Sequence, residues 1–207
     1  MTNAHTLLNR RSLLKGTAGA LVVGFSLDAT LARAAGAAMP VLRPAKSVAK
    51  DLVDSFVSVE PNGKVTIFVG KVDLGTGTKT AMAQMAADEL DVAFEQVEMV
   101  MGDTATTPDQ WLTGANLTIA QGGGELRKAC ATARAALLVR AAAKLGVPAS
   151  ELTVNRGIVS VKTNPSQSVA YSALMQGESS ASLKVDAKIT TKPASEYKVV
   201  GKSIPRG

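Results

Sequence analysis

Residues 122–145 constrain the fold most strongly, because apolar side chains recur there at the spacing of an α-helix along the whole stretch. The residues of this predicted buried stripe are Leu126, Cys130, Ala133, Leu137, Ala141 and Leu145. The basic residues that fall outside the stripe are Arg127, Arg134 and Lys144. Gly146 and Pro148 are typical of a helix end. The sequence therefore predicts one long helix with a buried face.

Shorter patterns upstream of this helix predict strands and one further helix. Residues 56–59 and 65–69 alternate or are β-branched, and they flank the turn signal Pro-Asn-Gly at 61–63, which predicts a hairpin. Residues 81–90 have apolar positions at helical spacing, and residues 96–100 return as a half-buried strand.

Residues 102–117 show no periodicity and predict an ordered loop. Downstream of the long helix, residues 152–154 and 158–161 are expected to pair as strands, residues 169–175 to form a short helix, and residues 181–207 to be irregular. This order of elements predicts an α+β fold, with a mixed sheet packed by two longer helices, rather than a doubly wound sheet.

The first 34 residues are typical of an export signal. Arg10 and Arg11 precede Ser-Leu-Leu-Lys, a mildly apolar stretch follows at 16–27, and Ala32-Arg33-Ala34 supplies the small residues that a signal peptidase needs. The arginine pair resembles a twin-arginine signal, and an ordinary secretory leader is the alternative. Either leader predicts a periplasmic protein, and an uncleaved leader would associate it with the inner membrane. Residues 35–52 are expected to form an extended linker.

Composition excludes several classes of function. The net charge is +6, but the basic residues are scattered and aromatic residues make up only 3% of the chain, so no nucleic-acid partner is expected. The single His, His5, lies in the predicted leader, which excludes a Ser-His-Asp triad and imidazole-based metal sites in the processed chain. The single Cys, Cys130, is expected to be a small buried apolar residue.

Glycines precede two of the predicted helices, at residues 75–77 and 122–124. The first run continues as GTGTKT, but Thr78 stands where a phosphate-loop motif has glycine, and Thr80 stands where a dinucleotide fingerprint has its third glycine. Glycines before a helix still expose backbone N–H groups that suit an anion. The alternative is that these glycines only make tight turns and close helix packing. The residues alone leave both interpretations open.

The acidic residues offer no catalytic pair. Asp88, Glu89 and Asp91 are expected to be a solvated helix end, and no two acids have a spacing that demands acid–base chemistry. No catalytic residue and no protein metal ligand is therefore assigned. Trp111, in an otherwise polar loop, is expected either to line a ligand channel or to anchor the loop.

Between residues 54 and 177, several short motifs follow one another in a fixed order. They are VDLGTG at 72–77, TAMAQMAADEL at 80–90, MGDT at 101–104, PDQ at 108–110, TGA at 113–115, QGG at 121–123 and LGVPASELTV at 145–154. Together they resemble the molybdopterin-binding subunits of the xanthine dehydrogenase and aldehyde oxidase family, in particular the exported branch typified by the beta chains of isoquinoline 1-oxidoreductases. The resemblance implies that residues 53–180 form part of a molybdopterin-binding domain and that residues 181–207 begin the next family domain.

The resemblance also implies a cofactor, molybdopterin cytosine dinucleotide with its molybdenum, whose pyrophosphate is held by backbone amides. The positions that match the family's cofactor contacts are Gly75, Thr76, Gly77, Thr113, Gly114, Ala115, Asn116, Thr118, Gly122 and Gly123. The family commonly has Gln at the position of Thr76 and Ser at the positions of Ala115 and Asn116.

The enzyme that the resemblance implies hydroxylates aldehydes or N-heterocycles with oxygen from water, and it passes electrons to a [2Fe-2S] small subunit and onward to a cytochrome c subunit. The family's glutamate base lies far downstream of position 207. The chain is therefore expected to be an N-terminal fragment or one half of a split subunit, inactive without the C-terminal part of the large subunit. The rival hypotheses are a catalytically inactive periplasmic binding or interaction domain and an unstable pseudogene product.

Overall fold

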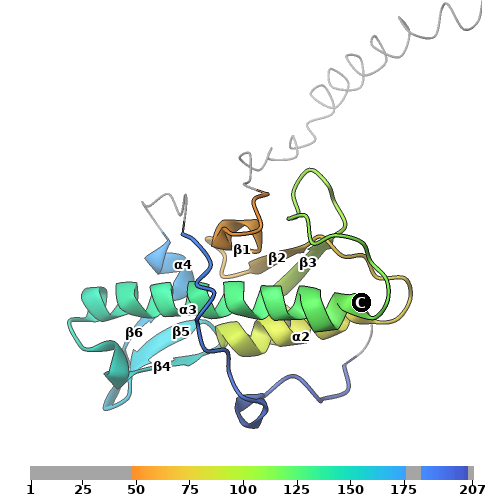
Figure 1. The fold of residues 1–207 in the computed structure, drawn as a ribbon. Coiled ribbons are helices and arrows are strands. Elements are labelled where there is room, and N and C mark those ends of the chain that lie inside the picture. Colours follow the sequence, from red (N-terminus) through yellow and green to blue (C-terminus); the bar gives the residue numbers. More distant parts are fainter. Residues whose placement is uncertain (1–47, 176–182, 205–207) are drawn as a thin grey trace, which may run out of the picture. The chain divides into compact units, whose positions relative to one another are not determined.

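The computed structural model describes residues 48–175 and 183–204, so the predicted leader lies outside the described residues. The described part contains two three-stranded sheets and two long helices (Figure 1). The predicted α+β class is confirmed. The strands are divided between a mixed sheet, as expected, and a second, antiparallel sheet. No helix in the described ranges is long and apolar enough to cross a membrane.

The mixed sheet has the order β1-β2-β3. Strand β1 (Val57–Val59) is antiparallel to β2 (Val65–Val69), which confirms the hairpin, and β2 is parallel to β3 (Val97–Met101). All five residues of β2 are buried because this strand lies in the middle of the sheet. Parallel strands need a crossover connection, which the predicted helix α2 (Thr78–Leu90) supplies. The carboxyl ends of β2 and β3 therefore lie at the same edge of the sheet.

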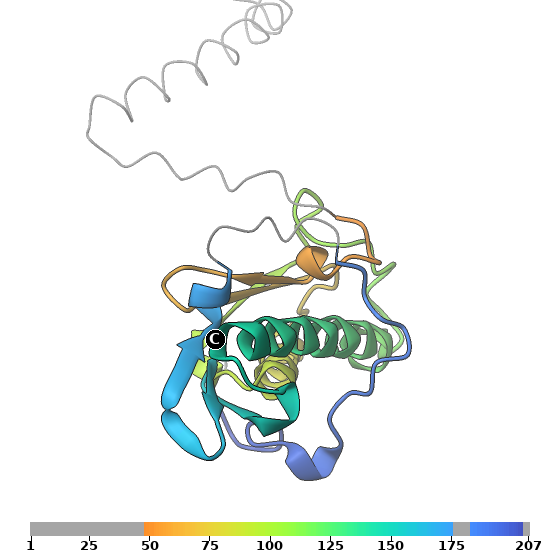
Figure 2. The same ribbon diagram turned by 90° about the vertical axis from the view of Figure 1, so that its left-hand side faces the viewer.

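Helix α3 (Gly124–Leu145) packs along α2 and contacts both sheets (Figure 2). Its predicted stripe is buried at Leu126, Cys130, Ala133, Leu137 and Ala141, and half-buried at Leu145. Burial raises the pKa of the Cys130 thiol, so this side chain is an inert apolar filler, as expected. Gly146 ends the helix in the left-handed conformation with φ 69°.

The second sheet packs beside the C-terminal end of α3 (Figure 1). It consists of β4 (Leu152–Asn155), β5 (Ile158–Val161) and β6 (Asn164–Ala170), all antiparallel. The prediction for residues 169–175 is wrong in part, because β6 runs through residue 170 and only α4 (Tyr171–Leu174) is helical. Most of β6 is polar and exposed at the edge of the sheet, so it lacks the apolar alternation by which the other strands were found.

The long helix begins earlier than expected. A π-helical turn, η3 (Thr118–Gly123), runs directly into α3, so the glycine run at 122–124 lies inside the helical segment rather than before it. A π-helix forms i→i+5 hydrogen bonds, and its residue spacing departs from the 3.6-residue period that sequence patterns reveal. This departure explains why the start was misplaced.

The C-terminal segment, residues 183–204, is irregular as predicted, apart from the short turn η5 (Ala194–Glu196). Leu52 forms an isolated bridge with Lys184, and the N–H of Val53 donates to the carbonyl of Leu183 at 2.8 Å. The segment then runs beside α2 and α3 (Figure 2). It is thereby attached to the domain at several places despite having almost no secondary structure.

Leu126 provides a test of the predicted core. Its side chain lies on the buried face of α3 and has no exposure to solvent, so Leu126→Ala should lower the free energy of unfolding by about 2–5 kcal/mol. The measurement is urea unfolding of the 207-residue chain followed by circular dichroism. Leu74→Ala is the matched control, because that leucine is 73% exposed and its truncation should change little. Equal effects of the two substitutions would contradict the assigned core.

Candidate functional site

Both loops that carry predicted site residues begin at one edge of the mixed sheet. Val69 at the end of β2 and Met101 at the end of β3 are register partners, and the N–H of Gly102 donates to the carbonyl of Val69 at 2.9 Å. Ligands of open sheets with parallel strands bind outside the carboxyl ends of those strands. Residues 70–77 and 102–117 therefore lie where a ligand site is expected.

A buried lysine joins these two loops. The side chain of Lys71 is fully buried, and its ammonium donates to the carbonyl oxygens of Gln110 and Leu112 at 2.5 and 2.7 Å. A buried ammonium is costly unless hydrogen bonds compensate for the lost water. Lys71 thus fixes the path of the loop after β3 against the residue that follows β2.

The side chain of Gln110 completes the connection. Its Oε1 accepts a hydrogen bond from the N–H of Gly70 at 3.0 Å, and its Nε2 donates to the carbonyl of Gly122 at 3.3 Å and to Oε2 of Glu125 at 2.7 Å. One amide therefore contacts the end of β2, the π-helical turn and the first turn of α3. We call Lys71 and Gln110 together the loop clasp.

Gly122 and Gly123 are needed for close packing. A Cβ at Gly122 would lie 3.2 Å from Cγ of Lys71, and a Cβ at Gly123 would lie 2.7 Å from Cε of Met85 on α2. Both glycines are buried. The sequence left two interpretations of this glycine run open, an anion site and close helix packing, and the structure favours close packing. The helical segment begins at Thr118, so the backbone N–H groups without a partner inside the helix are those of Thr118 and the residues just after it.

The first glycine loop is closed by its own carboxylate. Oδ1 of Asp73 accepts hydrogen bonds from the N–H groups of Gly75, Thr76 and Gly77 at 2.9, 2.9 and 3.2 Å, and Oδ2 accepts one from Lys79 at 2.9 Å. The hydrogen bond from Lys79, followed by those from the glycine loop, holds the pKa of Asp73 below its usual 3.8. The backbone donors that were expected to face an anion are thus occupied from within the chain.

The second loop is attached to the first by Thr113, whose Oγ1 accepts a hydrogen bond from the N–H of Val72 at 3.1 Å. Ala115 and Asn116 adopt the left-handed conformation, with φ 47° and 61°. Such backbone conformations are uncommon for residues with a side chain and gather at functional sites. Trp111 is 67% exposed and also left-handed, so its ring does not anchor the loop by burial.

The structure brings the predicted site residues to one end of the domain. The first group, Gly75, Thr76 and Gly77, lies directly before α2. The second group, Thr113 to Asn116, follows the part of the second loop that the clasp holds. The third group lies in the π-helical turn and consists of Thr118, Gly122 and Gly123. The hydrogen bond from Val72 to Thr113 and the clasp join the two groups. Cofactor contact at each of these residues remains a prediction.

The residues that hold this site together were missed by sequence reasoning. Lys71, Asp73 and Gln110 belong to the quoted motifs or adjoin them, but no pattern indicated that Lys71 is buried, because lysine is usually exposed. The available signal was local: an acid two residues before a glycine loop and five residues before a helix start is a candidate cap. The contacts of Lys71 with residues about forty positions away left no signal in the sequence.

The expectation that Asp88, Glu89 and Asp91 form a solvated helix end is wrong. All three carboxylates are buried, because the C-terminal segment covers them. The oxygens of Asp88 accept hydrogen bonds from the backbone N–H groups of Lys198, Val199 and Val200, the shortest at 2.7 and 2.8 Å. The irregular C-terminal segment thus finds acceptors for its backbone N–H groups on the acidic C-terminal end of α2.

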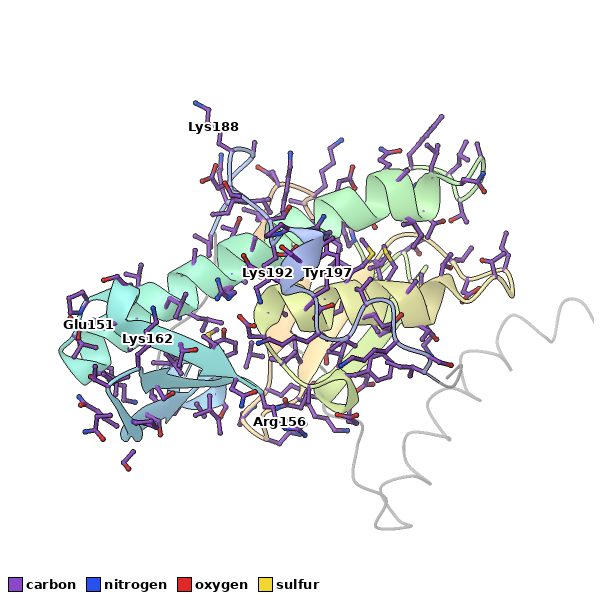
Figure 3. All side chains as sticks on the ribbon, turned by 90° about the horizontal axis from the view of Figure 1, so that it is seen from below. Glu151, Arg156, Lys162, Lys188, Lys192 and Tyr197 are labelled. Carbon is purple, nitrogen blue, oxygen red and sulfur yellow. The ribbon has the colours of Figure 1, made fainter. Side chains whose placement is uncertain are left out.

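Ion pairs complete this attachment. Glu89 pairs with Arg127 at 2.7 Å, and Asp91 pairs with Arg134 and Lys192, each at 2.6 Å. Lys192 and Tyr197 of the C-terminal segment lie over the two long helices (Figure 3). The guanidinium of Arg127 stacks over the ring of Tyr197, 5.3 Å from its centroid.

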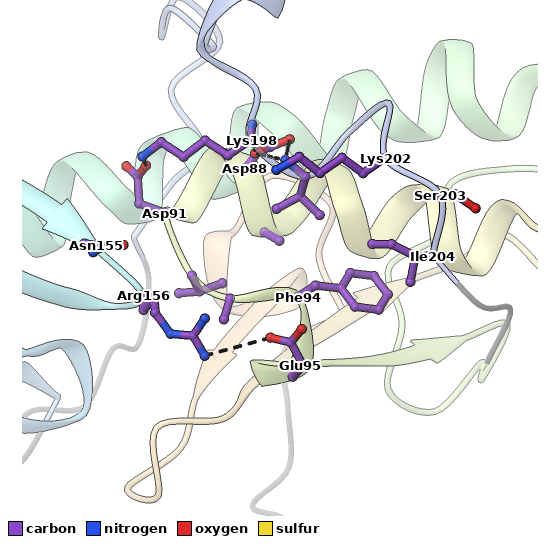
Figure 4. A pocket seen from close by; sticks show the side chains of 14 residues that line it. Asp88, Asp91, Phe94, Glu95, Asn155, Arg156, Lys198, Lys202, Ser203 and Ile204 are labelled. Carbon is purple, nitrogen blue, oxygen red and sulfur yellow. Dashed lines mark hydrogen bonds and ion pairs between the residues drawn. The ribbon is translucent and has the colours of Figure 1, made fainter.

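A pocket of about 370 Å³ opens beside this cluster, between the end of α2, the turn after β4 and the C-terminal segment (Figure 4). Phe94, Val199 and Ile204 contribute apolar side chains to its lining, and the exposed side chains of Arg156 and Glu95, also in the lining, form an ion pair at 4.0 Å (Figure 4). The pocket lies at the opposite end of α2 from the glycine loops. Within the described residues, no group of three or more His, Cys, Asp or Glu side chains could hold a metal ion.

The loop clasp generates a testable prediction. Lys71→Met removes both hydrogen bonds to the second loop and leaves the buried carbonyl of Gln110 and the partly buried carbonyl of Leu112 without their donor, so the free energy of unfolding should fall by about 1–3 kcal/mol. Hydrogen–deuterium exchange of residues 108–117 should become faster. Lys188→Met is the control, because Lys188 is exposed and its backbone N–H donates to Asp186, far from this loop in the sequence. Unchanged exchange in the Lys71 variant would contradict the role of the clasp.

A second prediction concerns the buried acid at the end of α2. Asp88→Ala removes the acceptor of three consecutive N–H groups, so tryptic cleavage after Lys198 should become faster. Limited proteolysis with mass spectrometry measures this rate. Glu95→Ala serves as the control, because that carboxylate is 76% exposed. If both variants are cleaved as slowly as the unaltered chain, Asp88 does not hold the segment.

Comparison with known proteins gives a consistent assignment. A family model described as molybdopterin cofactor-binding domain matches residues 28–203. A nicotinate dehydrogenase subunit of Pseudomonas putida is 41% identical over 151 residues, which is 73% of this chain and 12% of that protein. The beta chain of isoquinoline 1-oxidoreductase of Brevundimonas diminuta is 32% identical over 120 residues, which is 55% of this chain and 15% of that protein.

Among solved structures, quinoline 2-oxidoreductase from Pseudomonas putida 86 is 25% identical, with a TM-score of 0.49 over 57% of this chain and 15% of that one. The matched region spans only about an eighth of the length of the nicotinate dehydrogenase subunit. The family model, by contrast, covers most of the 207 residues and includes both glycine-containing segments. The resemblance in the sequence motifs is confirmed, and the chain belongs to the molybdopterin cofactor-binding domain family.

Proposed function

We propose that this chain supplies cofactor-binding loops of a molybdenum hydroxylase large subunit, which binds molybdopterin as its cytosine dinucleotide and oxidises aldehydes or N-heterocycles with water as the source of oxygen. The observation that carries this proposal is the clasped pair of loops at the carboxyl ends of β2 and β3. Family membership supports the cofactor, and the shared sheet edge supports its location.

The residues present fit such a cofactor in part. Oγ1 of Thr78 is buried and has no partner among the described residues, so it is available to a ligand. The N–H groups from Thr118 onward lie at a helical start, where backbone donors lack partners within the helix. The N–H groups of Gly75 and Gly77 do not fit in this conformation, because they already donate to Asp73.

The proposed division of labour follows from these contacts. When bound, the molybdenum centre supplies the two-electron oxidation of the substrate. Thr113 and Thr118 would hold the cofactor by hydrogen bonds, and the loop clasp would keep their loop in place while the substrate reacts. Rigid positioning matters, because misplacing a reacting group by about 1 Å costs on the order of a hundredfold in rate.

The rest of the assembly is also a proposal. Several relatives are named as subunits, which supports partner subunits for this chain. We infer that they include a [2Fe-2S] small subunit and a cytochrome c subunit that carry electrons away from the site. The arginine pair Arg10 and Arg11 supports export through the twin-arginine pathway to the periplasm.

Metal and cofactor analysis of the protein purified from its native host tests the proposal. Molybdenum and a pterin dinucleotide should co-purify with this chain. Thr113→Val should lower the molybdenum content, because it removes the hydroxyl that accepts from Val72 and attaches the second loop to the first. Thr153→Val is the matched control, since Thr153 lies on the exposed side of β4.

A chain isolated with its partners but without molybdenum or pterin would contradict the proposal. That outcome would favour the second candidate, a non-catalytic periplasmic binding or interaction domain. The occupation of the first loop's backbone donors by Asp73 is the observation that favours this second candidate.

A further inference from the structure

The pocket at the C-terminal end of α2 takes no part in the function proposed above, because it lies at the opposite end of that helix from the glycine loops. We propose that this pocket binds a small organic anion in which a carboxylate is joined to an apolar body. In this arrangement the apolar body contacts Phe94 and Ile204, and the carboxylate lies near Lys202 and Arg156.

The walls of the pocket are fixed before any ligand enters. The C-terminal segment is held on α2 where Asp88 accepts hydrogen bonds from the N–H groups of Val199 and Val200, at 3.0 and 2.8 Å. The turn after β4 is held on the same helix end, where the N–H of Gly157 donates to the carbonyl of Asp91 at 2.9 Å. The cavity of about 370 Å³ falls within the range of about 300–1,000 Å³ that is typical of small-molecule sites. Because the walls are already in place, binding loses little conformational entropy.

Apolar side chains form part of the lining. Val92 belongs to the hydrophobic core, whereas Phe94, Val199 and Ile204 are only half-buried. The half-buried side chains keep apolar surface exposed, and removing that surface from water favours an apolar ligand body. Figure 4 draws Phe94 between the C-terminal segment and the turn that carries Arg156.

Two of the three carboxylates in the lining are already engaged. Asp88 accepts hydrogen bonds from the backbone of the C-terminal segment, and Asp91 pairs with two basic side chains at 2.6 Å each. The third, Glu95, is 4.0 Å from Arg156, and the two side chains are 76% and 69% exposed. An exposed ion pair at that distance is weak, so the guanidinium of Arg156 is available to another anion.

Lysines of the C-terminal segment add positive charge to the pocket. Nζ of Lys198 lies 3.5 Å from Oδ1 of Asp91, and the lysine side chain is exposed. Among the described residues, no ion pair or hydrogen bond engages the ammonium of Lys202, whereas its backbone carbonyl accepts from Gln84 at 3.0 Å. The pocket thus combines apolar surface with cations that lack a close partner, and this combination suits a carboxylate on an apolar body.

Nuclear magnetic resonance of the ¹⁵N-labelled 207-residue chain tests this pocket with 4-phenylbutyrate at pH 7. The amide resonances of Phe94, Glu95, Arg156 and Lys202 should move saturably, while those of the loops at 70–77 and 102–117 stay in place. The amine 4-phenylbutylamine has the same apolar body with a cation, and acetate has the charge without the body. Neither should move the pocket resonances at the concentration at which phenylbutyrate saturates them.

Two substitutions should change the affinity in opposite directions. Lys202→Met removes a cation and keeps an apolar stem, so the dissociation constant of phenylbutyrate should rise about two- to fivefold. Glu95→Gln removes the carboxylate that competes for Arg156, so the constant should fall by about the same factor. Lys188→Met should leave the constant unchanged, because it alters the net charge equally at an exposed lysine outside the lining.

Three outcomes would overturn the proposal: no saturable movement at the pocket amides, equal movement with phenylbutylamine, or equal effects of the substitutions at Lys202 and Lys188. The chain terminus of a partner protein presents the same chemistry as a small acid, and the peptide N-acetyl-Ala-Ala-Phe with a free carboxylate tells the two apart. Tighter binding of this peptide than of phenylbutyrate would overturn the assignment of a small molecule. Molybdenum content takes no part in these readouts, so a failure here leaves the proposed function standing.

Discussion

The buried ammonium of Lys71 is the interaction on which the arrangement of both loops depends. It has no exposure to water, and the carbonyl oxygens of Gln110 and Leu112 take the place of water around it. Gln110 then contacts the end of β2 and the start of the helical segment. Gly122 has no side chain because the stem of Lys71 fills that space. The strand end, the loop and the glycine run therefore depend on one another.

Charged groups hold helix α2 at both ends. Asp73 caps its N-terminus through the N–H of Lys79. At the C-terminal end, Asp88 accepts hydrogen bonds from the backbone of the C-terminal segment, and Asp91 pairs with Arg134 on α3. Charges that are usually solvated thus work here as structural contacts, each with its partners in place. Asp73 thus positions the glycine loop before α2, and Lys71 and Gln110 position the glycine run before α3.

Sequence patterns located the elements whose burial is periodic and missed what depends on contacts between distant residues. The stripe from Leu126 to Ala141 and the hairpin of β1 and β2 were predictable because one face of each is apolar. Strand β6 is polar at an edge, and the π-helical turn breaks the helical period, so neither left a signal. The glycine loops were found from their composition. The burial of Lys71 and of Asp88 could not be predicted, because it depends on partners about forty and about one hundred and ten positions away in the chain.

The central claim is that the two clasped loops hold a molybdopterin cofactor at the carboxyl ends of β2 and β3. A crystal structure of the cofactor-loaded protein, assembled with its native partner chains, tests this claim most directly. The account predicts pterin density within hydrogen-bond distance of Thr78 and of the segment that includes Thr113 and Thr118, with Asp73 still bound to its own loop. Density for the cofactor with neither loop in contact, or with its phosphates on the amides of Gly75 and Gly77 in place of Asp73, would contradict it.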